Sequence, residues 1–105
     1  MTKEIQKEIN ATVMLAYEAV NKELDHHYGK RLRSCTAYVY ETENFYALRS
    51  YNTIVACIHK KSNTLYDFLR YVYGYTFTSA QHISKFRHDY TPYPWNFPVY
   101  TYREV

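Results

Sequence analysis

The spacing of the apolar residues changes once along this chain, and that change constrains the fold more than any other feature. From residue 3 to residue 28, apolar side chains recur every three or four positions, which is the period of one helical face. From residue 35 onwards the period falls to two, which is typical of β-strands. A long helix followed by consecutive strands predicts an α+β fold. The helical stripe consists of Ile5, Ile9, Val13, Ala16, Val20 and Leu24.

The predicted N-terminal helix runs from about Lys3 to Tyr28. Thr2 is a suitable N-cap, because its hydroxyl can accept a hydrogen bond from a backbone N–H of the first turn, and Gly29 is a suitable C-cap. We expect the apolar stripe to be buried against the chain's own sheet. Because a helix of this length extends past a small sheet, a homodimer formed through the helix is the alternative.

The two-residue alternation predicts an antiparallel sheet of three to five strands. The segment 53–59 is apolar on both faces, so we expect it to be a central strand. Tyr51 and Asn52 interrupt the strand pattern, or form a bulge, just before it. Turn residues separate the segments, with ETEN at 41–44 and KKSN at 60–63. The predicted strands are residues 35–42, 45–50, 53–59 and 64–68.

A run of alternating aromatic residues follows the last of these strands. The alternation favours a further strand over 71–77, with its rings on one face. A helical turn over 69–73 is the alternative, because apolar residues there are also three and four positions apart. The aromatic residues are Tyr71, Tyr73, Tyr75 and Phe77.

A short second helix is predicted near 79–89. Thr78 and Gln81 have the spacing of a capping box, in which two side chains satisfy the free N–H groups of a helix start. We expect His82 and Lys85 to lie on the outward face of this helix. The inward face is formed by Ala80, Ile83, Phe86 and Tyr90.

The C-terminal segment is rich in proline and aromatic residues. Three prolines between positions 92 and 98 exclude a helix and predict an extended tail. Trp95 is costly to expose, so we expect the tail to pack across the domain or to dock on a partner. Residues 99–102 are suited to an edge strand.

Composition narrows the function classes. A chain of 105 residues predicts a single domain over 1–105, and neither a membrane-spanning run nor a signal peptide is evident, so we expect a cytoplasmic protein. In that compartment Cys35 and Cys57 are expected to be reduced and buried. The net charge of +3 permits nucleic-acid binding without requiring it.

No catalytic constellation is evident in the sequence. With only two glycines, Gly29 and Gly74, the chain has no glycine-rich phosphate-binding loop. His82 and His88 are six positions apart, which does not place them on one helical face as a zinc site requires. We therefore predict no enzyme activity, no metal site and no cofactor.

Tyrosine is the one extreme of the composition, with 14 residues, 13 of them at or after position 28. Tyrosine and arginine are enriched at protein interfaces, so a protein-binding role is the preferred hypothesis. Stacking of bases on tyrosine, with lysine and arginine on phosphates, is the alternative. The candidate partner-binding residues are Arg70, Tyr71, Tyr73, Tyr75, His82, Lys85 and Trp95; the candidate nucleic-acid residues are Arg49, Lys60, Lys61, Arg70, Tyr73 and Arg87.

Two stretches, 48–58 and 71–90, resemble a small domain family of tailed phages and prophages of Gram-positive bacteria. The family pattern is a SYNT-x-VA strand followed by a Y-x-x-T-S-x-x-H-I-x-K-F segment, and the resemblance does not extend to the N-terminal helix or the tail. The matching residues are Ser50, Tyr51, Asn52, Thr53, Val55 and Ala56, and then Tyr75, Thr78, Ser79, His82, Ile83, Lys85 and Phe86.

The resemblance implies an origin in a mobile element, and it carries no assigned chemistry. Small phage accessory proteins without catalytic motifs are often inhibitors of host defence, including anti-CRISPR proteins. The resulting expectation is a non-catalytic inhibitor of a host defence complex, such as a Cas nuclease, in the cytoplasm of the bacterial host. A phage DNA- or RNA-binding accessory protein is the alternative.

Overall fold

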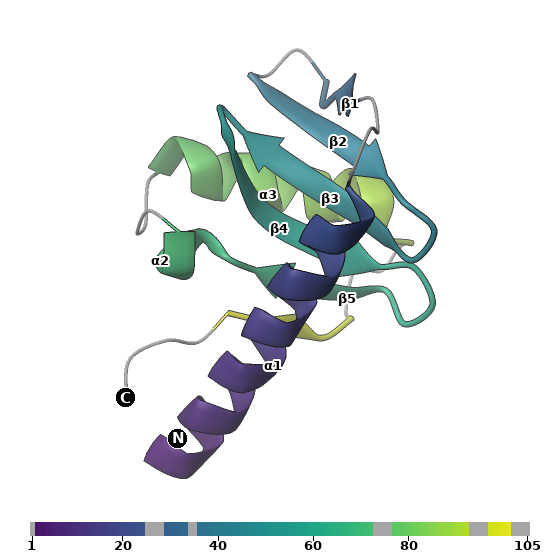
Figure 1. Cartoon of the computed structure of the whole chain (residues 1–105). Helices are drawn as coiled ribbons and strands as arrows, with labels where there is room; N and C mark the ends of the chain where they lie inside the picture. Colours follow the sequence, from purple (N-terminus) through teal and green to yellow (C-terminus); the bar gives the residue numbers. More distant parts are fainter. Residues whose placement is uncertain (1, 25–28, 34–35, 73–76, 93–96, 102–105) are drawn as a thin grey trace.

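Figure 1 shows the computed structural model, which describes residues 2–24, 29–33, 36–72, 77–92 and 97–101. The α+β class is confirmed. The helices are α1 (Lys3–Glu23), α2 (Leu69–Val72) and α3 (Phe77–Tyr90). The strands are β1 (Gly29–Arg31), β2 (Ala37–Glu41), β3 (Phe45–Ser50), β4 (Thr53–His59), β5 (Thr64–Asp67) and β6 (Val99–Tyr100).

The six strands form one sheet in sequence order, from β1 to β6. Neighbouring strands are antiparallel up to β5, whereas β6 lies parallel to β5, with Leu65 opposite Val99. The prediction of three to five antiparallel strands is therefore wrong in number and in its last pairing. One added strand, β1, lies in a segment where no strand was predicted, and β6 is the predicted edge strand of the tail.

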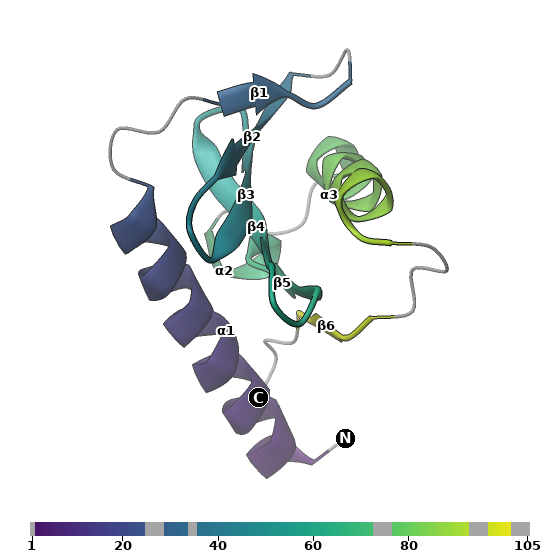
Figure 2. The same cartoon turned by 90° about the vertical axis from the view of Figure 1, so that its right-hand side faces the viewer.

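The sheet is covered on both faces by helices. In Figure 2, α1 lies on one side of the sheet and α3 on the other. Because β4 is apolar on both faces, it contributes to both cores: Val55 and Ile58 pack in the cluster with α3, and Cys57 packs in the cluster with α1. The prediction that 53–59 is a central strand is confirmed, and Cys57 is a buried free thiol, while Cys35 lies outside the described residues.

Helix α1 begins as predicted, with the Thr2 hydroxyl accepting a hydrogen bond from the Ile5 N–H. It ends earlier than predicted, with Leu24 as its C-cap. Gly29 is not a cap but a residue of β1, where the Tyr40 ring lies so close that an added Cβ would be 2.7 Å from its Cζ. The later part of the stripe is buried as expected. Its first residue, Ile5, is 45% exposed, and the first turns of α1 extend beyond the sheet (Figure 1).

The predicted strand over 71–77 is wrong at both of its described ends. Tyr71 lies in helix α2, and Phe77 is the first residue of α3, while 73–76 lie outside the described residues. The alternative, a helical turn, is confirmed over Leu69–Val72. The turn forms because the Asp67 carboxylate accepts a hydrogen bond from the Leu69 N–H at 2.9 Å. It also brings the adjacent apolar residues, Phe68 and Leu69, into the interior.

Candidate functional site

The described members of the predicted partner-binding set do not form a row of exposed rings; they are Arg70, Tyr71, His82 and Lys85. Arg70 is exposed on α2, whereas Tyr71 is half-buried and donates a hydrogen bond to Asn10 Oδ1 on α1 at 2.6 Å. Tyr71 therefore ties α2 to α1. The other three aromatic residues of the set lie outside the described part of the chain; they are Tyr73, Tyr75 and Trp95.

His82 was expected to point outward, and this is wrong, because its side chain is only 4% exposed. Its Nδ1 lies 2.9 Å from Ser50 Oγ, which in turn lies 3.1 Å from Ser79 Oγ. Helix α3 begins at Phe77, so Thr78 lies within its first turn and is not a cap. The buried face then includes polar residues that the apolar stripe had left out; it consists of Ser79, His82, Ile83 and Phe86.

The Ser50–Ser79–His82 cluster unites both halves of the sequence resemblance in one place. A serine hydroxyl beside a histidine nitrogen resembles a nucleophile with its base. Ser50 is 0% exposed and Ser79 is 1% exposed, however, so a substrate carbonyl has no approach to either hydroxyl. We conclude that the cluster joins the end of β3 to the start of α3 and satisfies three buried polar groups.

Acidification is expected to destabilise the protein through His82. Burial, assisted by the nearby Lys85 ammonium, lowers the pKa of His82 below its usual 6.5. Between the pKa of His82 in the unfolded chain and its lower pKa in the folded chain, the unfolded chain binds more protons. The free energy of unfolding therefore falls as the pH is lowered through this interval. Urea unfolding from pH 8 to pH 5, at about one-unit steps, should show this loss relative to His82→Asn, which cannot titrate. The same dependence of the free energy of unfolding on pH in the wild type and in His82→Asn would contradict this prediction.

The predicted nucleic-acid residues are dispersed over the described structure. Lys60 is paired with Glu41 at 2.6 Å, and Lys61 is exposed on the β4–β5 turn. Arg87 on α3 donates to the carbonyl oxygen of Phe97 at 3.1 Å. With Arg70 on α2 and Arg49 on β3, these cations are distributed over three elements and one turn. Tyr73 lies outside the described residues.

Arg49 is part of an aromatic cluster that sequence reasoning missed. Its guanidinium carbon lies 5.2 Å from the Tyr38 ring centroid and 5.5 Å from that of Tyr40. An irregularity in the pairing of β3 with β4, between Leu48 and Arg49, accompanies this orientation. We call Tyr38, Tyr40 and Arg49 the Tyr–Arg face. Tyr40 also packs at the edge of the cluster that contains α1, so this face lies on the α1 side of the sheet.

The Arg49 guanidinium makes no ion pair within the described residues. Its Nε is buried and has no hydrogen-bond partner among them. Cation–π contacts with two rings hold the group in place without occupying its in-plane N–H donors. The available sequence signal was the alternation in β2, where Ala37 and Val39 are apolar and Tyr38 and Tyr40 point to the opposite face.

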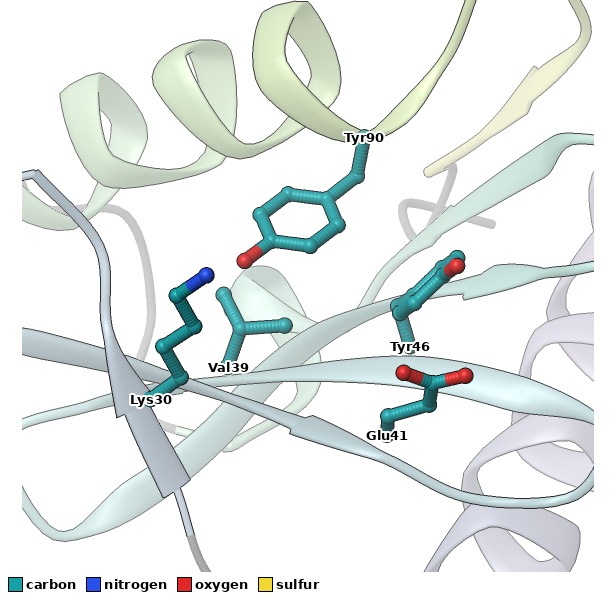
Figure 3. A pocket seen from close by; sticks show the side chains of 5 residues that line it. All are labelled: Lys30, Val39, Glu41, Tyr46 and Tyr90. Carbon is teal, nitrogen blue, oxygen red and sulfur yellow. The ribbon is translucent and has the colours of Figure 1, made fainter.

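A pocket lies on the face of β2 and β3 opposite the Tyr–Arg face (Figure 3). It has a volume of about 350 Å³ and lies between β1, β2 and β3 and the last residue of α3. The Tyr46 and Tyr90 ring centroids are 5.1 Å apart. Lys60 Nζ lies 5.1 Å from the Tyr46 ring centroid while it pairs with Glu41. The lining residues are Lys30, Val39, Glu41, Tyr46 and Tyr90.

Three further findings bear on function. Across the ranges that the structure describes, no group of three or more His, Cys, Asp or Glu side chains is arranged to hold a metal ion. None of the described helices combines the length and the apolar character needed to cross a bilayer. No family model, curated protein or solved structure matches this chain.

Proposed function

We propose that this chain is a non-catalytic binding protein whose Tyr–Arg face docks on an acidic surface of a protein partner. The observation that carries the proposal is the Arg49 guanidinium, which rests on two tyrosine rings and pairs with no carboxylate in the described structure. A carboxylate of the partner would pair with the terminal N–H groups of this guanidinium.

The physical properties of the face support this role. Arginine and tyrosine are the residues that most often dominate the energetics of interfaces. A guanidinium already held by two rings loses little side-chain entropy on binding, so more of the interaction energy is retained. Tyr38 and Tyr40 are half-buried, which fixes their rings and leaves part of each available for contact.

The class of partner is proposed from the sequence resemblance. A domain of the phage and prophage type without a catalytic constellation fits a counter-defence role in its bacterial host, with a defence complex such as a Cas effector as the target. Inhibition would then follow from occupation of a surface that the effector needs, without chemistry by this chain.

A plasmid-interference assay tests the proposal. Cells that carry a CRISPR–Cas effector and a targeted plasmid should regain transformants when they express the wild-type chain. Arg49→Ala should raise the Kd of the complex with the inhibited effector about 30-fold, because truncation of a dominant interface arginine costs about 2 kcal/mol. Lys61→Ala is the matched control, since it removes an exposed charge from the distant β4–β5 turn. Failure to inhibit any of a panel of effectors, or full inhibition by Arg49→Ala, would refute the proposal.

A second candidate is a phage accessory protein that binds single-stranded DNA or RNA through the same face. Tyrosine rings stack on bases, and an arginine fork binds phosphate, so the geometry at Arg49 also favours this function. Gel-shift titrations with a single-stranded oligonucleotide at low and high salt separate the two candidates. Salt-sensitive binding that Tyr38→Ala weakens would favour the nucleic-acid function. Absence of binding would exclude it.

A further inference from the structure

We propose that the pocket between β1–β3 and the end of α3 binds a single nucleotide whose base carries an exocyclic amino group. This site is separate from the Tyr–Arg face, because the two lie on opposite faces of β2. In the register of the sheet, Lys30 pairs with Val39 and Glu41 pairs with Tyr46. The four polar lining groups are therefore held by paired strands and by the C-terminal residue of α3.

Among the described residues, the charged groups around the pocket leave one cation without an ion-pair partner. Lys60 is paired with Glu41, and Arg33 is paired with Asp89, each at 2.6 Å. Within the described residues the exposed Lys30 makes no ion pair, and Figure 3 shows its ammonium group directed toward the Tyr90 hydroxyl. A ligand with one anionic group beside Lys30 would balance this charge.

The hydrogen-bonding groups of the site indicate the rest of the ligand. The hydroxyls of Tyr46 and Tyr90 have no hydrogen-bond partner within the described residues, so both can donate to an anion. Burial, together with Asp89, raises the pKa of Tyr90, which keeps its hydroxyl protonated. Lys60 donates a hydrogen bond to Glu41 Oε2, so Glu41 Oε1 can accept one from an amino group of the ligand.

The size and walls of the pocket fit a mononucleotide. Its volume of about 350 Å³ is at the lower end of the range of about 300–1,000 Å³ that is usual for small-molecule sites. The Tyr46 and Tyr90 rings and Val39 supply an apolar wall for a planar base. The phosphate of the nucleotide would lie beside Lys30 and the two phenol hydroxyls, and the amino group of the base would donate to Glu41. Every polar group that lines the pocket would then be used.

Saturation-transfer NMR with CMP, UMP and cytidine tests the assignment. CMP should bind saturably. UMP should bind at least about tenfold more weakly, because it presents a carbonyl where cytosine presents an amino group to Glu41. Cytidine should also bind more weakly, because it lacks the phosphate. Lys30→Ala should weaken CMP about tenfold and leave cytidine unchanged, while Lys61→Ala should leave CMP unchanged.

Two further variants separate a built site from general charge attraction. Tyr90→Phe removes one hydroxyl and retains the ring, and it should weaken CMP several-fold. Glu41→Gln should reduce the difference between CMP and UMP. No saturable binding of CMP, equal affinity of CMP and UMP in the wild type, or an unchanged CMP affinity in Lys30→Ala would overturn the proposal. It would also be overturned if an oligocytidylate bound and CMP did not, since the ligand would then be a strand. Each outcome is independent of the interference assay on Arg49.

Discussion

Phe68→Ala is expected to lower the free energy of unfolding by about 3–5 kcal/mol, the usual cost of truncating a buried phenylalanine. Phe68 is 0% exposed, and its ring meets Tyr17 of α1 edge-on, with the centroids 5.0 Å apart. Its backbone N–H also donates to the Val55 carbonyl at 2.7 Å, and its carbonyl accepts from Tyr71 at 2.8 Å. Truncation therefore opens a cavity where β4, α1 and α2 meet. Urea unfolding followed by circular dichroism measures the change.

Thiol labelling shows whether the stability lost in Phe68→Ala is lost from the core between α1 and the sheet. Cys57 is buried in the same cluster as Phe68, and burial raises its pKa well above the usual range of a thiol. In a Cys35→Ser background, Phe68→Ala should make Cys57 react faster with a thiol reagent under native conditions. Phe77→Ala is the matched control, because that ring is 72% exposed and its loss should change stability by less than about 0.5 kcal/mol. Similar stabilities of the two variants would show that Phe68 does not hold this core.

His82→Ala is expected to cost about 2–4 kcal/mol of stability, from a cavity and from the loss of the bond to Ser50. The Ser50 hydroxyl is fully buried, with Ser79 Oγ 3.1 Å away, so water cannot replace the bond that it loses with Nδ1. His82→Asn should recover part of the loss, because its amide can occupy the position of Nδ1. Thermal and urea unfolding of the three proteins provide the comparison.

His88→Ala on the same helix is the control for this experiment. Its side chain is 55% exposed and interacts with Arg33 and Asp89 at the surface, so its removal should cost less than about 1 kcal/mol. If His82→Ala kept wild-type stability and abolished binding to the partner, the outward, partner-binding role predicted from the sequence would be correct and the buried role would be wrong.

The central strands were predictable because their residues satisfy local rules. The segments 45–50 and 53–59 were predicted with the boundaries that the structure has, since turn residues flank each and the apolar alternation is regular. Asn63 has a φ of 56° in the KKSN turn, the backbone geometry that asparagine tolerates well. The Thr2 cap is equally local, because donor and acceptor are three residues apart.

The features that were predicted wrongly or missed have a common physical origin, because each of them depends on a partner distant in sequence. His82 was assigned to the surface because it is polar, and its hydrogen bond with Ser50, 32 residues away, helps to make its burial favourable. The strand β1 has no apolar pattern, and it exists because β2 offers hydrogen bonds and the Tyr40 ring covers Gly29. The Tyr–Arg face was missed because Arg49 reaches Tyr38 and Tyr40 across neighbouring strands.

The sequential order of the sheet has a consequence for how the chain folds. Strands β2 to β5 are joined by short turns, so most pairings close small loops and lose little chain entropy. The exception is β6, whose Val99 pairs with Leu65 across 34 positions (99 − 65). Proteins dominated by local pairings reach their native state faster than those that depend on remote ones. The hairpins of the meander are therefore the natural nucleus, and capture of β6 belongs to a late stage of the reaction.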